Sequence, residues 1–188
     1  MSVAILAFGA ISGLGRGKGA ASAGEFGERA RIVTRSDEEL AASKLARPFC
    51  ARADVAATDP DRATAILHAA MTDLAGALDA RSPGWRKKRV GLALATSSGG
   101  MRSAEALFRA LREGRALDRD AAERATYFAP MQHVFASESF APATLVLTAC
   151  AASTIAIGIA MGWLEGGACD LAIAGGFDAV SVFVASGF

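Results

Sequence analysis

Histidine and cysteine are scarce in this chain, and neither is spaced as a metal site or a disulfide framework requires. The 188 residues include two histidines, His68 and His133, and three cysteines, Cys50, Cys150 and Cys169. Neither histidine has a second His, Cys or carboxylate at ligand spacing, so we predict no metal site. An odd and sparse set of cysteines is typical of reduced thiols, which predicts a cytoplasmic protein.

Basic side chains are missing from the last third of the chain. No Lys or Arg follows Arg124, and the only later charges are Glu138, Glu165, Asp170 and Asp178. Over the whole chain 20 basic residues stand against 19 acidic ones, for a net charge of +1. Because nucleic-acid-binding domains carry a basic excess on one face, we expect no nucleic-acid partner. A C-terminal third with so little charge predicts burial against another surface.

Residues 139–164 carry no charge at all, and this run is long enough to be tested as a membrane span. Pro142 and several polar and glycine residues interrupt it, its flanks are acidic, and its pattern changes from strand-like to helix-like at Cys150. A membrane-inserted protein is therefore the least favoured hypothesis. The apolar residues 2–11 are not preceded by the basic residues of a signal peptide, and we expect no membrane partner.

The glycine-rich residues 13–19 do not form a nucleotide-binding motif. Gly19 follows Lys18 where a phosphate loop needs Ser or Thr, and Ser12 occupies the place of its first glycine. The segment does fit the least specific form of the dinucleotide-binding motif, but that motif opens a helix and no helical pattern follows here. We therefore predict no nucleotide cofactor.

Apolar patterns along the chain alternate between the periods of strands and helices. Short apolar runs ended by glycine or serine are typical of strands buried in a parallel sheet. Apolar residues three and four positions apart, after a capping residue, predict helices. This alternation favours βαβ units and a mixed, mostly parallel five-stranded sheet. The strands are expected at 3–8, 89–96, 143–148, 169–174 and 179–185, the helices at 36–45, 60–80, 101–113, 118–124 and 150–165, and an ordered connection at 126–142.

The expected helix at 150–165 is apolar on every side, and Glu165 is its only charge. A helix of that kind is buried all round, whereas a helix in an ordinary three-layer α/β fold keeps one face in water. We infer a central helix between two sheets, of which 188 residues can supply only one. Residues 1–188 are therefore expected to form one half-domain of a larger layered fold.

Cys150 lies where an expected strand ends and an expected helix begins, among small neighbours. A sharp strand-to-helix elbow raises a nucleophile above a sheet and accepts only small residues around it. The helix N-terminus offers free N–H groups and a positive dipole end, which favour a thiolate and can bind an oxyanion. This placement suits covalent acyl chemistry. The alternative is a buried structural cysteine, as we expect for Cys50 and Cys169.

Several ordered segments of the chain resemble β-ketoacyl synthases of the thiolase superfamily, above all around Cys150. The resemblance implies a thiolase-like α/β fold, of which this chain is the N-terminal half, layered αβαβα when a second half completes it. The matching segments are LTACAAS at 147–153, AIG at 156–158, GGACDLAIAGG at 166–176, the second strand with its TSSGG turn at 90–100, the opening strand and turn at 3–15, and the G-F element at 187–188.

The same resemblance implies a decarboxylative condensing enzyme. Cys150 matches the nucleophile that takes an acyl group from a carrier-protein thioester, after which a malonyl-type extender loses carbon dioxide and its enolate attacks the acyl-cysteine. Phe188 is similar in place to a residue that lines the acyl pocket, and Met131 falls in a loop that in this family can reach the neighbouring subunit's pocket. Family members are homodimers joined through the edge strand that ends at the cysteine, here Ala143 to Thr148.

The chain departs from that family in lacking its other catalytic groups. The family needs two histidines and a lysine from its second half to stabilise the enolate, and neither His68 nor His133 matches their motifs. An enolate without preorganised donors loses the largest catalytic contribution. We therefore expect this chain alone to be acylated at Cys150 at most, and condensation to need a complementary C-terminal half. A non-catalytic scaffold or chain-length-controlling half is the alternative, and a fatty acid or a polyketide pathway stays open.

Overall fold

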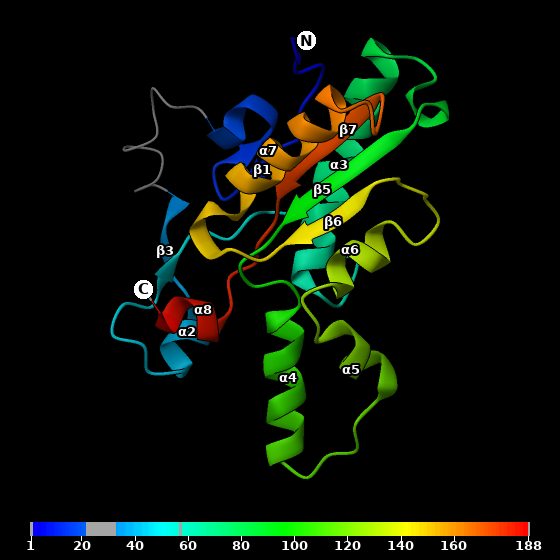
Figure 1. Cartoon of the computed structure of the whole chain (residues 1–188). Helices are drawn as coiled ribbons and strands as arrows, with labels where there is room; N and C mark the ends of the chain where they lie inside the picture. The colour runs from blue at the N-terminus through cyan, green and yellow to red at the C-terminus, as the bar shows by residue number, and fades with distance from the viewer. Residues whose placement is uncertain (1, 22–32, 57, 188) are drawn as a thin grey trace.

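The structure is a computed structural model that describes residues 2–21, 33–56 and 58–187. Its centre is a parallel sheet of three strands in the order β6-β5-β7, and two short antiparallel pairs lie outside it (Figure 1). The strands are β1 (Ile11–Ser12), β2 (Gly15–Arg16), β3 (Arg35–Ser36), β4 (Phe49–Cys50), β5 (Val90–Ala95), β6 (Ala143–Val146) and β7 (Leu171–Gly176). The α-helices are α2 (Glu38–Ala42), α3 (Arg62–Arg81), α4 (Met101–Arg112), α5 (Arg119–Arg124), α6 (Ala129–Val134), α7 (Ala152–Glu165) and α8 (Val182–Ser186), with 3-10 helices at Gly17–Ala21, Trp85–Lys87 and Ala149–Ala151.

The two faces of the middle strand β5 bury different side chains. All six residues of β5 are buried, as expected of a central strand in a parallel sheet. Leu92 and Leu94 belong to a core that includes residues of α3 and is flanked by α6, whereas Ala93 and Ala95 pack against α7. Side chains along a strand alternate between its faces, so the chain forms three layers with the sheet in the middle. The α/β class and the parallel order of these three strands are confirmed.

The N-terminal caps explain where the helices begin. α3 begins after Asp61 rather than at Pro60, because the buried Asp61 carboxylate accepts a hydrogen bond from Thr64 N at 2.8 Å. α2 likewise begins after Asp37, not after Ser36, and it ends at Ala42. The connection expected at 126–142 contains the short helix α6.

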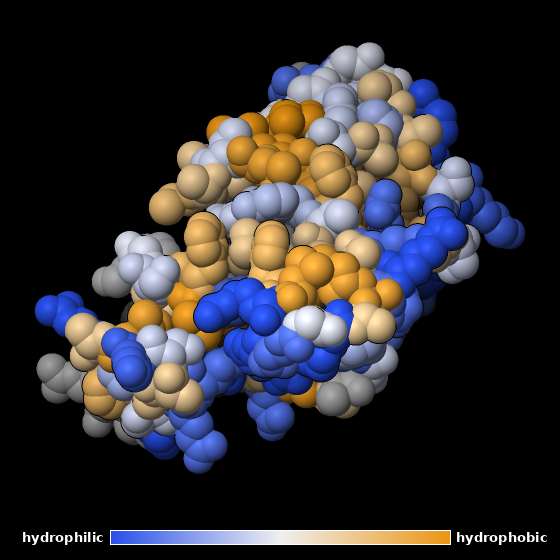
Figure 2. Space-filling model, turned by 90° about the horizontal axis from the view of Figure 1, so that it is seen from below, coloured by the Kyte–Doolittle hydropathy of each residue, from blue (hydrophilic) through white to orange (hydrophobic). Residues whose placement is uncertain are grey.

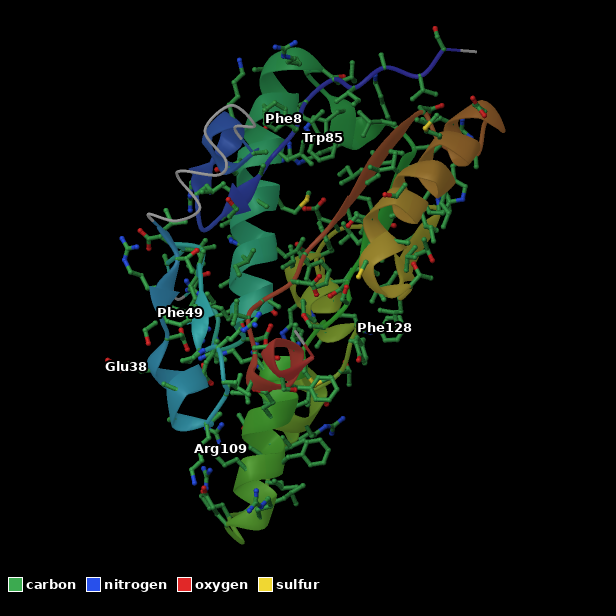
Figure 3. All side chains as sticks on the ribbon, turned by 90° about the vertical axis from the view of Figure 1, so that its left-hand side faces the viewer. Phe8, Glu38, Phe49, Trp85, Arg109 and Phe128 are labelled. Carbon is green, nitrogen blue, oxygen red and sulfur yellow. The ribbon has the colours of Figure 1, made fainter. Side chains whose placement is uncertain are left out.

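The expected first strand at Val3–Phe8 is wrong. Residues 2–9 make no backbone hydrogen bond to another described residue, because no described strand lies beside them. The segment instead rests on α3 so closely that a Cβ on Gly9 would lie 2.2 Å from the carbonyl oxygen of Ala70. Ile5 is 91% exposed and Phe8, seen in Figure 3, is 53% exposed. Within the described residues, the apolar pattern here marks a segment that packs on α3 with several exposed side chains rather than a paired strand.

The expected fifth strand at Ala179–Ala185 is also wrong, because the chain forms helix α8 there. Ser181 caps this helix, its hydroxyl oxygen accepting from Val184 N at 3.2 Å. A short apolar run is compatible with either a strand or a helix, and the serine decides the outcome. Within the described residues the central sheet therefore has three strands where the sequence predicted five.

Helix α7 buries only one side within the described chain. Ala152, Ala156 and Ala160 pack on the sheet, while Ile157 and Met161 are 48% and 44% exposed. Figure 2, a view from below, shows hydrophobic surface in orange beside blue hydrophilic areas, so apolar groups reach the exterior on that face as well. No helix in the described ranges is long and apolar enough to cross a membrane.

Candidate active site

Three connections meet at the carboxyl edge of the sheet. Because β5, β6 and β7 run parallel, the residues that follow them lie at one edge, where α/β proteins form their sites. Residues 96–100 follow β5, residues 147–151 follow β6, and Phe177 with Asp178 follows β7. The expected nucleophile Cys150 is in the second of these connections.

The connection after β6 is a strained elbow. Ala149 has φ 49°, in the left-handed region that a residue with a Cβ rarely adopts. Cys150 follows in a single 3-10 turn and is exposed, and α7 begins two residues later. No side chain caps the start of α7. The first N–H group of α7, that of Ala152, donates to the Ala149 carbonyl oxygen, and no side chain accepts from the N–H groups that follow it. Those following groups are the ones predicted to bind a negatively charged oxygen.

A glycine lets the elbow approach the sheet. A Cβ placed on Gly176, the last residue of β7, would lie 2.2 Å from Ser153 Oγ and 3.2 Å from the carbonyl oxygen of Ala95. Ser153 is in the first turn of α7, so a larger residue at position 176 would displace the Ser153 hydroxyl and crowd that turn. The small residues of this region are needed for close packing between β7 and α7.

Asp178 holds the turn that follows β5, a role that the sequence analysis missed. Its Oδ1 accepts from Thr96 Oγ1 at 2.9 Å, from Ser98 Oγ at 2.6 Å, and from the backbone N–H groups of Ser97 and Ser98 at 3.0 and 2.7 Å. The Thr96 hydroxyl oxygen in turn accepts from Gly99 N at 2.7 Å. One carboxylate therefore joins the ends of β5 and β7. The sequence offers one indication of this role, since Asp178 is one of only four charged residues after Arg124.

The three cysteines have different surroundings. Cys150 is exposed, whereas Cys169 is buried at 3% exposure. Cys50 is half-buried, with its Sγ 3.4 Å from Asp37 Oδ2. Burial, and then the hydrogen bond to the Asp37 carboxylate, raises the pKa of the Cys50 thiol. Cys50 is therefore held in the unreactive thiol form, in keeping with the structural role expected for it.

We expect a limiting amount of iodoacetamide to modify Cys150 first when it is added to the native protein near neutral pH. Cys169 is shielded, and Cys50 is both half-buried and poorly ionised, so both should react slowly. Peptide mass mapping at increasing times measures the order of labelling. Modification of Cys50 ahead of Cys150 would contradict this assignment, and labelling after unfolding, when all three should react, is the control.

The other residues considered in the sequence lie on helices α3 and α6 or outside the described residues. His68 is exposed on α3, and His133 Nδ1 lies 3.1 Å from Arg124 Nη1. Met131 is in α6 rather than in a loop, packs on the core, and lines a hollow of about 280 Å³ with Phe135 and others. Phe188 is outside the described residues. The described ranges contain no cluster of His, Cys, Asp and Glu that could hold a metal ion.

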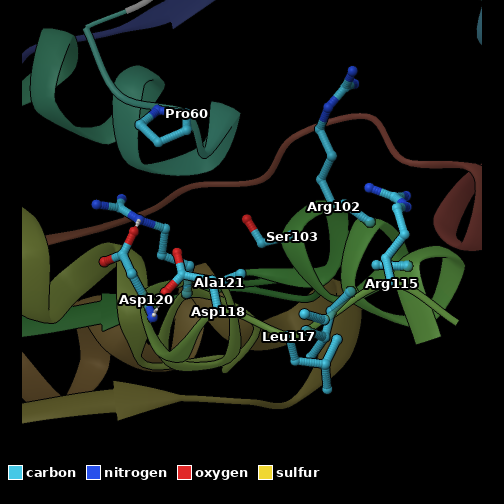
Figure 4. A pocket seen from close by; sticks show the side chains of 13 residues that line it. Pro60, Arg102, Ser103, Arg115, Leu117, Asp118, Asp120 and Ala121 are labelled. Atoms are coloured by element: carbon cyan, nitrogen blue, oxygen red, sulfur yellow. Dashed lines mark hydrogen bonds and ion pairs between the residues drawn. The ribbon is translucent and has the colours of Figure 1, made fainter.

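A larger hollow of about 400 Å³ lies between α4 and α5 (Figure 4). Its polar lining is already engaged within the chain. Arg102, Arg115 and Arg124 each pair with carboxylates, and Ser103 Oγ donates to Asp61 Oδ1 at 2.7 Å. Because these groups are satisfied, we assign the hollow no ligand.

The comparison with protein families decides the identity of this fold. The model described as "Beta-ketoacyl synthase, N-terminal domain" matches residues 51–185, most of the chain. The chain belongs to the β-ketoacyl synthase family. Its Cys150 elbow and its TSSGG turn both fall within the part that this domain covers. A search of proteins with curated functions finds no match.

A solved ketosynthase structure agrees with this family. The fold is similar to the crystal structure of a β-ketoacyl synthase from Burkholderia phymatum STM815, with a TM-score of 0.76 and 20% sequence identity. The match covers 98% of this chain and 48% of that one, so the chain spans about half the length of that synthase. The chain thus has the thiolase-like fold of the N-terminal half of a ketosynthase.

Proposed function

We propose that this chain is the nucleophile-bearing N-terminal half of a β-ketoacyl-acyl carrier protein synthase, acting in the cytoplasm. The observation that carries the proposal is the exposed Cys150, held at a strained elbow on the carboxyl edge of the sheet in a chain of the β-ketoacyl synthase family. The start of α7, which no side chain caps, supports it, because backbone N–H groups at a helix N-terminus can stabilise the oxyanion of an attacked thioester.

The proposed chemistry has two stages, both at Cys150. First, the Cys150 thiol gives up its proton and the thiolate attacks the carbonyl carbon of an acyl thioester on a carrier protein. The carbon–sulfur bond to the carrier breaks, and the carrier sulfur takes up a proton and leaves as a thiol. A malonyl-type extender then loses carbon dioxide, and the resulting enolate carbon forms a bond to the acyl carbon. The Cys150 thiolate leaves, and the product is a β-ketoacyl thioester two carbons longer.

We propose that a complementary half, carrying two histidines and a lysine, completes the site. Three unpartnered surfaces support this partner: the exposed side of α7, the apolar residues 2–9, and the outer edge of β7, beside which no described strand lies. A large exposed apolar area is typical of a surface that binds another protein surface. His68 lies on α3 and His133 Nδ1 lies 3.1 Å from Arg124 Nη1, so we assign neither of them the role proposed for the histidines of the complementary half.

We also propose a dimer contact along β6 and an acyl pocket lined in part by Met131 and Phe188. β6 is the other edge of the sheet, and the edge from Ala143 to Thr148 includes the 45% exposed Leu147, which supports pairing with a second copy. Met131 and Phe188 are proposed to line the acyl pocket. For Met131 the support is its place at the 280 Å³ hollow, which lies beside β6 residue Ala143.

The test is a condensation assay on the enzyme assembled with its complementary half. Given an acyl-carrier thioester and a malonyl-carrier thioester, it should release carbon dioxide and form a β-ketoacyl thioester. The separate chain should accept the acyl group without forming product, because the donors for the enolate are missing. An assembled, folded enzyme that forms no product from any acyl chain length would refute the proposed function.

A further inference from the structure

The elbow that carries Cys150 is held on both of its sides. Before it, the carbonyl oxygen of Val146, the last residue of β6, accepts from Thr96 N at 3.2 Å. After it, the first turn of α7 packs on the end of β7, so closely that a Cβ on Gly176 would overlap Ser153 Oγ. One support therefore comes from the residue that follows β5, and the other comes from the end of β7.

The Asp178 carboxylate ties these two supports together. Asp178 lies two residues after Gly176, and its Oδ1 accepts from the hydroxyls of Thr96 and Ser98 at 2.9 and 2.6 Å. Both hydroxyl-bearing residues are buried, at 2% exposure each. Hydrogen bonds to an ionised acceptor are stronger than those between neutral groups. The carboxylate therefore fixes the end of β5 relative to the end of β7.

The elbow needs such support because its backbone is strained. Ala149 has φ 49°, and a residue with a Cβ keeps that conformation only where the surrounding structure holds it. If the end of β5 moved relative to the end of β7, residues 147–151 could relax. The Cys150 sulfur would then shift relative to the N–H groups in the first turn of α7. Acyl transfer needs both in place, because the sulfur attacks the carbonyl carbon while hydrogen-bond donors bind the carbonyl oxygen.

We propose that Asp178 is a positioning residue that keeps the Cys150 sulfur and the first turn of α7 in the relative geometry that acyl transfer requires. This inference rests on the proposed function of Cys150. Asp178 acts through the end of β5 on one side of the elbow and through the end of β7 on the other. It does not touch substrate, and it forms and breaks no covalent bond.

Asp178→Ala should slow the acylation of Cys150 without lowering the reactivity of its thiol toward a small reagent. Alanine leaves the buried hydroxyls of Thr96 and Ser98 without this acceptor, so the end of β5 is released. Acyl transfer should slow by about tenfold or more, because it depends on the alignment of the reacting atoms. Alkylation by iodoacetamide needs only an accessible thiol, so its rate at Cys150 should stay within about twofold of the parental rate.

The matched control is Asp170→Ala, which removes a carboxylate that joins the same two strands at their other ends. Asp170 directly precedes β7, and Arg89 directly precedes β5. Asp170 Oδ1 accepts from Arg89 Nη2 at 2.6 Å, and its Oδ2 accepts from the backbone N–H of Arg89 at 3.2 Å. A role confined to holding β5 beside β7 would make the two variants alike. The positioning role instead predicts that Asp170→Ala is acylated within about twofold of the parental rate.

All variants are tested in the enzyme assembled with its complementary half. The probes are acetyl, hexanoyl and dodecanoyl thioesters of N-acetylcysteamine, with acylated Cys150 quantified over time by mass spectrometry and iodoacetamide used in a parallel series. A third variant, Asp178→Asn, can keep an oxygen in the place of Oδ1 but makes it neutral. We expect it to be acylated at an intermediate rate, about threefold below the parental one. Alkylation of Cys50 and Cys169 reports unfolding in any variant.

Three results would overturn the inference while leaving the proposed function in place. They are an unchanged acylation rate in Asp178→Ala, equal slowing of acylation and alkylation there, and equal slowing of acylation in Asp170→Ala. If Asp178→Ala unfolds, Asp178→Asn decides, and acylation of that variant at the parental rate would overturn the role. Failure of the parental enzyme to accept any of the three acyl groups would instead contradict the proposed function, and the positioning role would fall with it.

Discussion

Replacing Cys150 with alanine in the assembled enzyme is expected to lower β-ketoacyl product formation by roughly three orders of magnitude or more, as for other covalent nucleophiles. Alanine suits the elbow, where the neighbouring residues are also small, so the fold should persist. What is lost is the thiol that carries the acyl group between the two stages. The measurement is the rate of product formation from acyl and malonyl thioesters, with far-UV circular dichroism to confirm folding.

The matched control for this substitution is Cys50→Ala, which removes a half-buried thiol outside the elbow. It should leave the rate close to that of the parental enzyme. Unchanged product formation in Cys150→Ala would contradict the catalytic assignment and favour the alternative of a non-catalytic scaffold half. A loss in both variants would point instead to a general dependence of the fold on its cysteines.

Gly100→Ala is expected to destabilise the assembled protein by about 3 kcal/mol, the upper part of the usual range for forced overpacking. A Cβ at this buried position would lie 2.2 Å from the carbonyl oxygen of Arg124 and 2.6 Å from that of Thr126. Both atoms belong to the backbone, so no rotation of a side chain can relieve the contact. Gly100 also ends the turn beside the elbow and donates to Thr126 O at 3.1 Å, so we expect lower activity as well.

Gly76→Ala is the control for this prediction, because it makes the same chemical change where space is open. Gly76 is exposed inside α3, and a Cβ there would meet nothing within 4 Å. Alanine favours a helix interior over glycine by roughly 0.5–1 kcal/mol, so this variant should be slightly more stable. Thermal unfolding of both proteins measures the difference. If Gly100→Ala melts no lower than the parental protein, the close packing described for the turn is incorrect.

The features that sequence predicted well depend on nearby residues. β5, α3, α4 and α7 follow from apolar periodicity with capping residues and glycines at their ends, all of which act within a few positions. The Cys150 elbow could be predicted for the same reason, since a change of period among small residues marks the turn from β6 into α7. Only its strain, at Ala149, needed coordinates.

The features that sequence missed depend on partners far apart in the chain. Val3–Phe8 has the pattern of a strand, but a strand needs a neighbour for its backbone, and no described strand lies there. Asp178 binds residues 80 to 82 positions away, and Glu105 caps a helix 77 positions away. No local pattern carries such information. The cap of α8, by contrast, is a local signal that the strand prediction did not use, because Ser181 directly precedes the helix.

The most direct test of the central claim is to locate the acyl group on the enzyme. The assembled protein is incubated with an acyl-carrier thioester in the absence of extender, quenched in acid and digested, and the modified peptide is sequenced by mass spectrometry. The account predicts one acyl group per chain, attached to Cys150 and released by neutral hydroxylamine, as a thioester is. An acyl group on Cys50 or Cys169, with Cys150 unmodified, would contradict it.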